Sequence, residues 1–275
     1  MRTKRKDKIA AIGVDRGGTW TRVTALSSRL RPIRTARFRS TTLRELPLKL
    51  LKVVSRWTGA EEAPLVVATR GAFSKKWKKT FLTRALAGKL MLVDVISDAE
   101  AAHFAAFSGE AGLLLIAGTG SVAFSGKPGS FIKTGGFNPP KGDPGSGSWL
   151  GRRYLGLRGR RKEAAAMDHG SSAAYAKKLI SLAEKGDREC LDLVLAAHSE
   201  LASLLSRASG SRKGALRTAL AGGLMNSAYF RRGFVRAASA ALKGRRIIFV
   251  KTAIPAQEAA AQIALRRKKR TGTKK

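Results

Sequence analysis

The sequence is poor in cysteine and in acidic residues, and it has no long apolar run. One cysteine, Cys190, stands among 275 residues, which excludes an internal disulfide. The longest apolar stretches, such as residues 113–117, are far too short to span a bilayer. No signal-peptide segment follows the basic residues 1–8. These absences predict a cytoplasmic protein that makes no use of a membrane.

Basic residues outnumber the scarce acidic ones. Lys and Arg total 54 against 18 Asp and Glu, giving a formal net charge of +36, of which the tails 1–8 and 266–275 supply only four and seven. Such a charge attracts polyanions, including nucleic acid. No zinc-ligand spacing and no RNA-recognition signature accompanies it. A solvated surface rich in Lys and Arg is the simpler interpretation, so nucleic acid stays open as a partner but is not favoured.

Two glycine-rich turns, each set against apolar strand-like residues, are the most informative feature that is present. The first reads GVDRGGT at residues 13–19 and the second reads IAGTGS at residues 116–121. Glycine lets backbone N–H groups approach an anion closely, as in phosphate sites. Neither turn matches the P-loop or the dinucleotide-binding pattern. Alone, each could be a structural hairpin, but the pair suggests a nucleotide held from two sides.

Three of the eight aspartates fall at strand ends or glycine turns. Asp15 sits beside the first turn, where a carboxylate could hold Mg²⁺ through water. Asp98 ends a strand, where it could take a proton from a hydroxyl group or cap the following helix, and these roles are compatible. Asp143 lies in a glycine-rich segment and could simply form a turn. Arg16 could reach a phosphate or face solvent.

Apolar periodicity predicts an α/β protein with two domains. We expect a basic tail at 1–8, an N-terminal domain at 9–108, a C-terminal domain at 109–267 and a second basic tail at 268–275. The last helix could pack back on the N-terminal domain. Expected strands are 9–15, 20–26, 33–39, 65–68, 91–96, 113–117, 121–125, 216–221 and 245–251. Expected helices are 43–57, 73–90, 99–107, 163–183, 187–207, 227–242 and 255–267, and residues 126–151 are expected to be loop.

The order of these motifs resembles the BadF/BadG/BcrA/BcrD-type ATPase family, which includes N-acetylglucosamine kinases. That family belongs to the sugar-kinase, actin and heat-shock-chaperone superfamily. The resemblance covers about residues 9–265. It rests on five motifs in order, namely the first phosphate motif at 13–19, a catalytic segment at 97–102, the second phosphate motif at 116–121, sugar segments at 135–137 and 142–147, and an adenosine motif at 221–226. Ser97 replaces the usual Asn, and Pro144 replaces the usual Glu.

The resemblance implies two ribonuclease-H-like (actin-like ATPase) domains with ATP in the cleft between them. Asp98 would be the catalytic base, and Asp15 would hold Mg²⁺ through water. The sugar would contact Gly136, Phe137 and Asp143. ATP would be bound by residues of both glycine turns and of the adenosine motif, namely Asp15, Gly17, Gly18, Thr19, Gly118, Thr119, Gly120, Ser121, Gly222 and Gly223.

The resemblance makes the expected function an ATP-dependent kinase of N-acetylglucosamine or a related amino sugar, and it leaves room for a homodimer. A second hypothesis is an activator of a dehydratase or reductase. Such activators supply two cysteines per chain to an iron–sulfur cluster, and this chain offers only Cys190. A third hypothesis is a non-catalytic nucleotide-binding or nucleic-acid-associated protein. The acids retained at Asp15, Asp98 and Asp143 argue against it.

Overall fold

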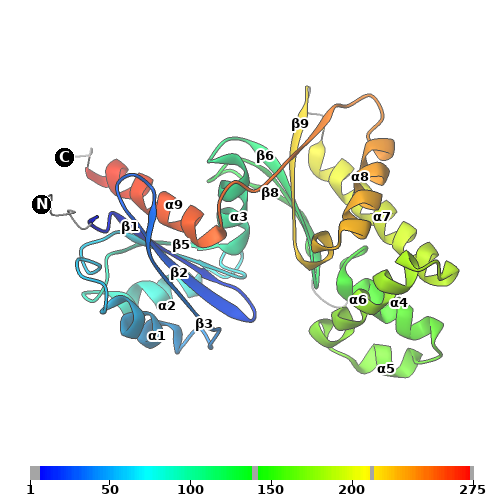
Figure 1. Cartoon of the computed structure of the whole chain (residues 1–275), viewed down its shortest axis with the longest axis horizontal. Helices are drawn as coiled ribbons and strands as arrows, with labels where there is room; N and C mark the ends of the chain where they lie inside the picture. Colours follow the sequence, from blue (N-terminus) through cyan, green and yellow to red (C-terminus); the bar gives the residue numbers. More distant parts are fainter. Residues whose placement is uncertain (1–6, 138–141, 211–213, 273–275) are drawn as a thin grey trace, which may run out of the picture. The chain divides into compact units, whose positions relative to one another are not determined.

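The computed structural model describes residues 7–137, 142–210 and 214–272, which fold into two α/β units (Figure 1). The first unit takes in the chain up to Ser108 and again from Thr252 onward, and the second comprises Gly109–Lys251. Each unit is built on one five-stranded mixed sheet. The expected α/β class with two related halves is confirmed.

The first sheet joins an antiparallel meander to two parallel strands. Its strands are β1 (Ala11–Arg16), β2 (Trp20–Leu26), β3 (Pro32–Arg39), β4 (Leu65–Thr69) and β5 (Leu92–Ser97), in the spatial order β3-β2-β1-β4-β5. The first three strands pair antiparallel, whereas β1, β4 and β5 run parallel. The first glycine turn is therefore the tip of the β1–β2 hairpin, as the sequence pattern predicts.

Helices cover both faces of this sheet because alternate strand residues point to opposite sides. Ile12 and Val14 of β1 face a core built with α1 (Leu46–Val54) and α2 (Trp77–Leu86). Ala11 faces the other core, which contains α3 (Asp98–Phe107) and α9 (Ala256–Gly272). The two buried layers hold the carboxyl-terminal ends of the parallel strands β1 and β5 in fixed positions on the same side of the unit.

The helix α9 belongs to the first unit, although the second unit separates it from the rest of that unit in sequence (Figure 1). It packs on β1, β2, β4 and α3, with four fully buried alanines against the sheet (Ala259, Ala260, Ala261 and Ala264). The second unit therefore ends at Lys251 rather than at 267. Residues 268–272 continue the helix rather than form the expected tail, and residues 1–6 and 273–275 lie outside the described chain.

The second sheet repeats the topology of the first. Its strands are β6 (Gly112–Ala117), β7 (Ser121–Gly126), β8 (Ile132–Gly135), β9 (Leu216–Ala221) and β10 (Ile247–Val250), in the order β10-β9-β6-β7-β8. Strands β6, β7 and β8 pair antiparallel, whereas β6, β9 and β10 run parallel. The second glycine turn joins β6 to β7, in the place that the first turn takes between β1 and β2.

Most helices of the second unit share one apolar core with its sheet. The helices that share it are α4 (Gly147–Leu157), α6 (His169–Glu184), α7 (Arg188–Ser209), the short 3₁₀ helix η1 (Gly223–Asn226) and α8 (Ala228–Ala241), and α5 (Arg161–Ala166) lies outside it. Within the residues that the structure describes, no helix is both long and apolar enough to cross a bilayer.

Two expectations for this unit are wrong. Residues 126–151 are not all loop, because they contain β8 and the start of α4. The single helix expected at 163–183 is two helices. The Asp168 carboxylate accepts the backbone N–H groups of Gly170 and Ser171, so it caps a new helix at this point.

Candidate functional site

The first glycine turn is held by the segment that follows β3. The Ser40 N–H donates to the Thr19 carbonyl at 2.9 Å, and the Ser40 hydroxyl donates to the Gly17 carbonyl at 2.9 Å. A Cβ at position 18 would lie 3.4 Å from a guanidinium nitrogen of Arg70, so the Arg70 side chain lies next to this turn. Gly18 and Thr19 are exposed, so the tip of this hairpin is accessible to a ligand.

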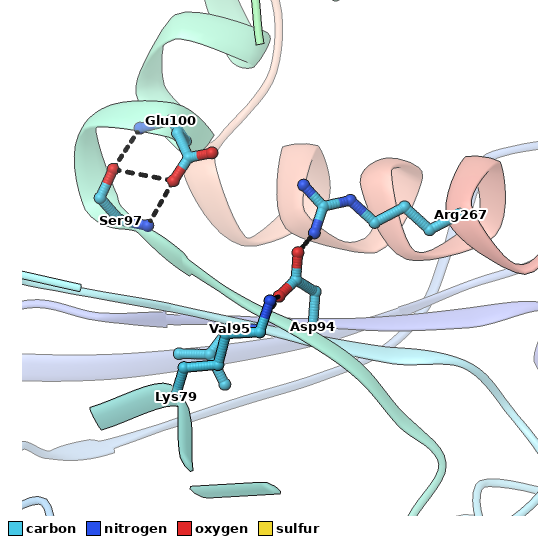
Figure 2. A network of polar contacts seen from close by, with 6 residues as sticks. All are labelled: Lys79, Asp94, Val95, Ser97, Glu100 and Arg267. Atoms are coloured by element: carbon cyan, nitrogen blue, oxygen red, sulfur yellow. Dashed lines mark hydrogen bonds and ion pairs between the residues drawn. The ribbon is translucent and has the colours of Figure 1, made fainter. Parts of the chain in front are cut away.

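Asp98 is placed by the junction between β5 and α3. Ser97 is the N-cap of α3, and its hydroxyl accepts the Glu100 N–H at 3.1 Å while the Glu100 carboxylate accepts the Ser97 N–H at 2.9 Å (Figure 2). This capping box satisfies the helix end. Among the described residues, the Asp98 carboxylate accepts one hydrogen bond, from the N–H of its neighbour Ala99 at 3.0 Å. The cap is therefore Ser97 rather than Asp98, and Asp98 is available for other chemistry.

Asp94, an acid within β5, links the sheet to two helices (Figure 2). Its carboxylate forms ion pairs with Lys79 of α2, at 2.6 Å, and with Arg267 of α9. It also accepts the Val95 N–H at 2.8 Å. Because α2 and α9 lie on opposite faces of the sheet, this one carboxylate links both helices to β5, the strand that ends at Ser97, next to Asp98.

Asp15, at the end of β1, is close enough to Asp98 for the two charges to interact. Burial raises the pKa of Asp15 above its usual range, and the charge of Asp98 adds to this, against the opposing effect of Arg22 at 3.4 Å. A divalent cation bound at Asp15 would relieve its repulsion by Asp98, and carboxylate oxygens are ligands that Mg²⁺ prefers. The donor set present at Asp15 therefore fits Mg²⁺.

The second glycine turn is fixed by the first turn of α4. The N–H groups of Gly147 and Ser148 donate to the carbonyls of Gly118 and Thr119, at 2.7 and 3.1 Å. The Ser148 hydroxyl lies 2.9 Å from Nδ1 of His169, at the start of α6. The sequence pattern did not predict this support, because residues 126–151 were expected to be loop and Ser148 and His169 lie on different helices.

The adenosine motif lies against the same turn. A Cβ on Gly118 would lie 3.5 Å from the Gly223 nitrogen. Gly222 has φ +97° and its Cβ would overlap the backbone of Ala117, so no other residue fits there without strain. Nothing lies within 4 Å of a Cβ placed on Gly223, so the backbone there borders open space. The structure thus joins the second phosphate turn and residues 222–223 in one unit.

The expected sugar-contact residues also meet at the second turn. Glycine at 120 makes room for the Asp143 carboxylate, which would overlap a Cβ there. The Gly136 N–H donates to the Ser121 carbonyl at 2.9 Å, and Phe137 is half exposed. Burial raises the pKa of Asp143, whereas backbone hydrogen bonds from Phe137 and Ser121 act to lower it. Its Oδ1 is buried without a hydrogen-bond partner in the described chain.

The expected residues therefore form two groups, one in each unit. Asp15, Asp98 and the turn at 17–19 lie in the first unit. The second unit brings together the turn at 118–121, the pair 222–223 and the sugar-segment residues Gly136, Phe137 and Asp143. Among described residues, no three His, Cys, Asp or Glu side chains form a metal-binding group of their own.

The sequence pattern of the BadF/BadG/BcrA/BcrD ATPase family matches residues 12–249. The chain belongs to this family. The match includes both glycine turns, Asp98 and residues 222–223, and it ends before α9. No curated protein matches the chain in sequence.

Several solved structures that are similar to this family member carry the names of sugar kinases. A candidate N-acetylglucosamine kinase from Chromobacterium violaceum has a TM-score of 0.66 at 21% identity, covering 94% of this chain and 99% of that one. The ROK hexokinase from Thermus thermophilus has a TM-score of 0.66 at 18% identity, covering 93% and 99%. A ROK-family glucokinase from Streptomyces griseus, solved with glucose and AMPPNP, has a TM-score of 0.57 at 18% identity, again covering 93% and 99%. At these identities the likeness establishes the fold.

Proposed function

We propose that the protein is an ATP-dependent sugar kinase whose acceptor is N-acetylglucosamine or a related amino sugar. The observation that carries the proposal is the position of Asp98. It directly follows β5, the parallel strand at one edge of the first sheet, and its charge interacts with that of Asp15 near the first glycine turn, while Ser97 rather than Asp98 caps the helix. A carboxylate so placed suits a general base that takes a proton from a hydroxyl group.

The chain has no P-loop pattern, so in this proposal two other glycine turns would bind the nucleotide through their backbone. In this proposal the turns at 17–19 and 118–121 bind phosphate through their N–H groups, and Gly222 and Gly223 let the adenosine approach the chain. Asp15 would hold Mg²⁺ through water, and the ion would neutralise charge on the phosphates when bound. Gly136, Phe137 and Asp143 would contact the sugar.

Asp98 would act by orienting one hydroxyl of the acceptor and receiving its proton as the oxygen attacks the terminal phosphorus of ATP, whose bond to the bridging oxygen would break so that ADP leaves. Phosphoryl transfer needs little covalent chemistry from the protein, so most of the acceleration would come from positioning and charge. The rigid junction that holds Asp98 serves this purpose, because Ser97 and Glu100 fix the backbone on both sides of it.

The activator of a dehydratase or reductase is a weaker candidate from the same family. Such an activator needs thiolates to ligate a shared iron–sulfur cluster. Cys190 is fully buried in α7, and burial raises the pKa of its thiol to about 11. A buried thiol held in its protonated form is unsuited to ligating iron, so we favour the kinase.

The kinase proposal is tested by measuring ATP consumption with a panel of amino sugars and hexoses. We expect at least one sugar to stimulate turnover, and we expect Asp98→Asn to lower kcat by about 10²- to 10⁴-fold. Asp192→Asn, an exposed acid on α7, is the matched control and should behave like the wild type. Turnover that no sugar stimulates, or a fully active Asp98→Asn protein, would refute the proposal.

A further inference from the structure

A groove of about 640 Å³ lies between α7 and α8 of the second unit, a volume in the range of small-molecule sites in proteins. On α7 its lining extends from residue 191 to residue 206, about 20 Å along the helix axis. Apolar side chains of both helices line it, among them Leu191, Val194 and Leu195 of α7 and Ala237, Ala240 and Ala241 of α8. The groove is therefore long and largely apolar.

The groove belongs to neither the nucleotide residues nor the sugar segments described above, because none of those residues lines it. The helix α7 supports the sugar segments with residues that do not line the groove. A Cβ on Gly145 would lie 2.8 Å from the Ala197 carbonyl oxygen and from the Leu201 side chain. A molecule in the groove would thus touch the same helix but would contact neither ATP nor the sugar.

An imidazole and a glycine face each other across the two helices. His198 lines the groove and is buried, with its ring 4.5 Å from that of Phe230. A Cβ on Gly233 would overlap Cε1 of this ring. Glycine is a poor helix former, yet Gly233 stands in the interior of α8. The imidazole explains the glycine, because a larger residue at 233 would displace it.

Neither ring nitrogen of His198 has a hydrogen-bond partner among the described residues. Burial lowers the pKa of the imidazole, the nearby Phe230 backbone opposes this in part, and the charge of Arg236 lowers it further, so the ring is neutral at pH 7. A buried polar atom without a partner costs free energy that a bound group would recover. Both nitrogens are covered, so a ligand would meet them when the ring turns about its Cβ–Cγ bond, a torsion with broad minima.

One cation accompanies the imidazole. Among the described residues, Arg236 is the one charged side chain that lines the groove, and it forms no ion pair in that part of the chain. A guanidinium binds a carboxylate through two parallel hydrogen bonds. A single cation matches the single charge of a carboxylate, whereas a phosphate monoester would bring a second charge without a partner. The hydroxyl groups of Ser199, Ser203 and Ser206 also line the groove.

The apolar wall calls for an apolar body on the same ligand. Leu195 is 54% exposed, and a chain laid along the groove would remove it from water. The alanines of α8 have short side chains, so they leave room for such a chain beside the leucines.

We propose that the groove between α7 and α8 binds an amphipathic carboxylate, whose extended aliphatic body lies against the leucines and alanines and whose carboxylate pairs with Arg236. The inference does not depend on the kinase function, because none of the residues proposed for ATP or sugar takes part and binding alone tests it.

The experiment compares octanoate, octanol, octylamine and acetate by isothermal titration calorimetry at physiological ionic strength. Octanol and octylamine replace the negative charge, and acetate lacks the apolar body. We expect octanoate to bind at one site with a Kd at least about tenfold lower than that of octanol or octylamine, as one charged hydrogen-bond contact provides. Acetate should show no saturable binding. Ring signals of His198 should move in NMR spectra with octanoate, whereas those of His103 and His169 serve as references.

Matched variants locate the binding. Arg236→Gln should weaken octanoate binding by about 10- to 100-fold, whereas Arg232→Gln, an exposed residue of α8 outside the groove, should leave it unchanged. Ala240→Trp fills the groove from an exposed position and should abolish binding, whereas Ser239→Trp adds the same bulk outside it. Thermal unfolding of each variant establishes that it is folded.

The remaining outcomes would overturn the inference. Equal affinity for octanoate and octylamine would show that the charge is not recognised. Octanoate binding that survives Ala240→Trp, or saturable binding of acetate, would assign the carboxylate to the basic surface elsewhere. If octanoate does not bind, the inference fails. If Ala240→Trp then also turns a dimer into a monomer by sedimentation, the groove is the contact surface of a second copy.

Discussion

Gly13 of β1 lies directly against the backbone of Gln257 in α9, so close that a Cβ on Gly13 would overlap the Gln257 carbonyl oxygen. Gly13→Ala must therefore push the helix off the sheet. We expect it to lower the free energy of unfolding by about 3 kcal/mol, at the upper end for overpacking. Urea denaturation measures this. Gly156→Ala, in α4 with space around its Cβ, is the control and should stabilise slightly or leave stability unchanged. Equal stabilities for the two variants would contradict the close contact between Gly13 and the backbone of α9.

Asp94 should matter more to stability than a surface acid does. Its carboxylate is largely buried, whereas its partners Lys79 and Arg267 are partly solvated and can return to water when it is lost. We expect Asp94→Asn to cost about 1–2 kcal/mol, between the values for exposed and buried pairs. Hydrogen exchange should show faster opening near the C-terminal end of α9. Lys79→Met is the comparison and should have the smaller effect. An Asp94→Asn protein as stable as the wild type would contradict the prediction.

Asp15 should trade stability for activity. Its pKa is raised in the folded state, so the folded protein binds the proton more tightly than the unfolded chain does. The ionised carboxylate therefore destabilises the fold at neutral pH, and this penalty disappears as the pH falls below the usual range for Asp. We expect Asp15→Asn to melt at a higher temperature than the wild type at pH 7 without nucleotide, with the difference shrinking toward pH 4. The variant should lose Mg²⁺-dependent turnover. A lower melting temperature at pH 7 would count against this account.

His198 should make the second unit sensitive to acid. The imidazole is 3% exposed, packs 4.5 Å from the Phe230 ring, and burial lowers its pKa from 6.5 to about 4. Folding favours the neutral imidazole. Its contribution to the free energy of unfolding is therefore intact above pH 6.5 and is lost as the pH falls from 6.5 to about 4. The full loss is about 3 kcal/mol.

Replacing the imidazole with an apolar side chain should remove that acid sensitivity. We expect stability of His198→Leu to depend less on pH than that of the wild type between pH 6.5 and 4. Chemical denaturation at several pH values provides the comparison. Wild-type and variant curves that run parallel through this window would show that His198 is not the responsible group.

The sequence predicts most strands of the two sheets well because strong periodic signals mark them, and it misses the short strand β8. The expected strand at 20–26 matches β2, and the alternation that buries Ile12 on one face and Ala11 on the other is a direct consequence of the pleat. The expected strand at 216–221 likewise matches β9. The duplicated order of strands follows from the repeated motif, a strand, a glycine turn and a strand.

The supporting side chains could not be predicted in the same way, because their partners lie far apart in sequence. Ser40 holds the first turn from 23 residues away from Gly17, and Ser148 meets His169 on a different helix. Nothing in the local pattern around Ser40 or His169 indicates these contacts. The capping box at Ser97 and Glu100 is the exception, since its spacing of three residues is a local signal that could have been used.

The place of α9 in the first unit also determines the order in which the two units can be completed during synthesis. The strands of the first sheet have all been made by residue 97, but the helix that covers one of its faces is not made until residues 256–272. The second unit is contiguous and has left the ribosome before that helix. The N-terminal unit therefore stays incomplete, with α3 alone on the face that α9 later covers, until the whole of the unit that follows it has been synthesised.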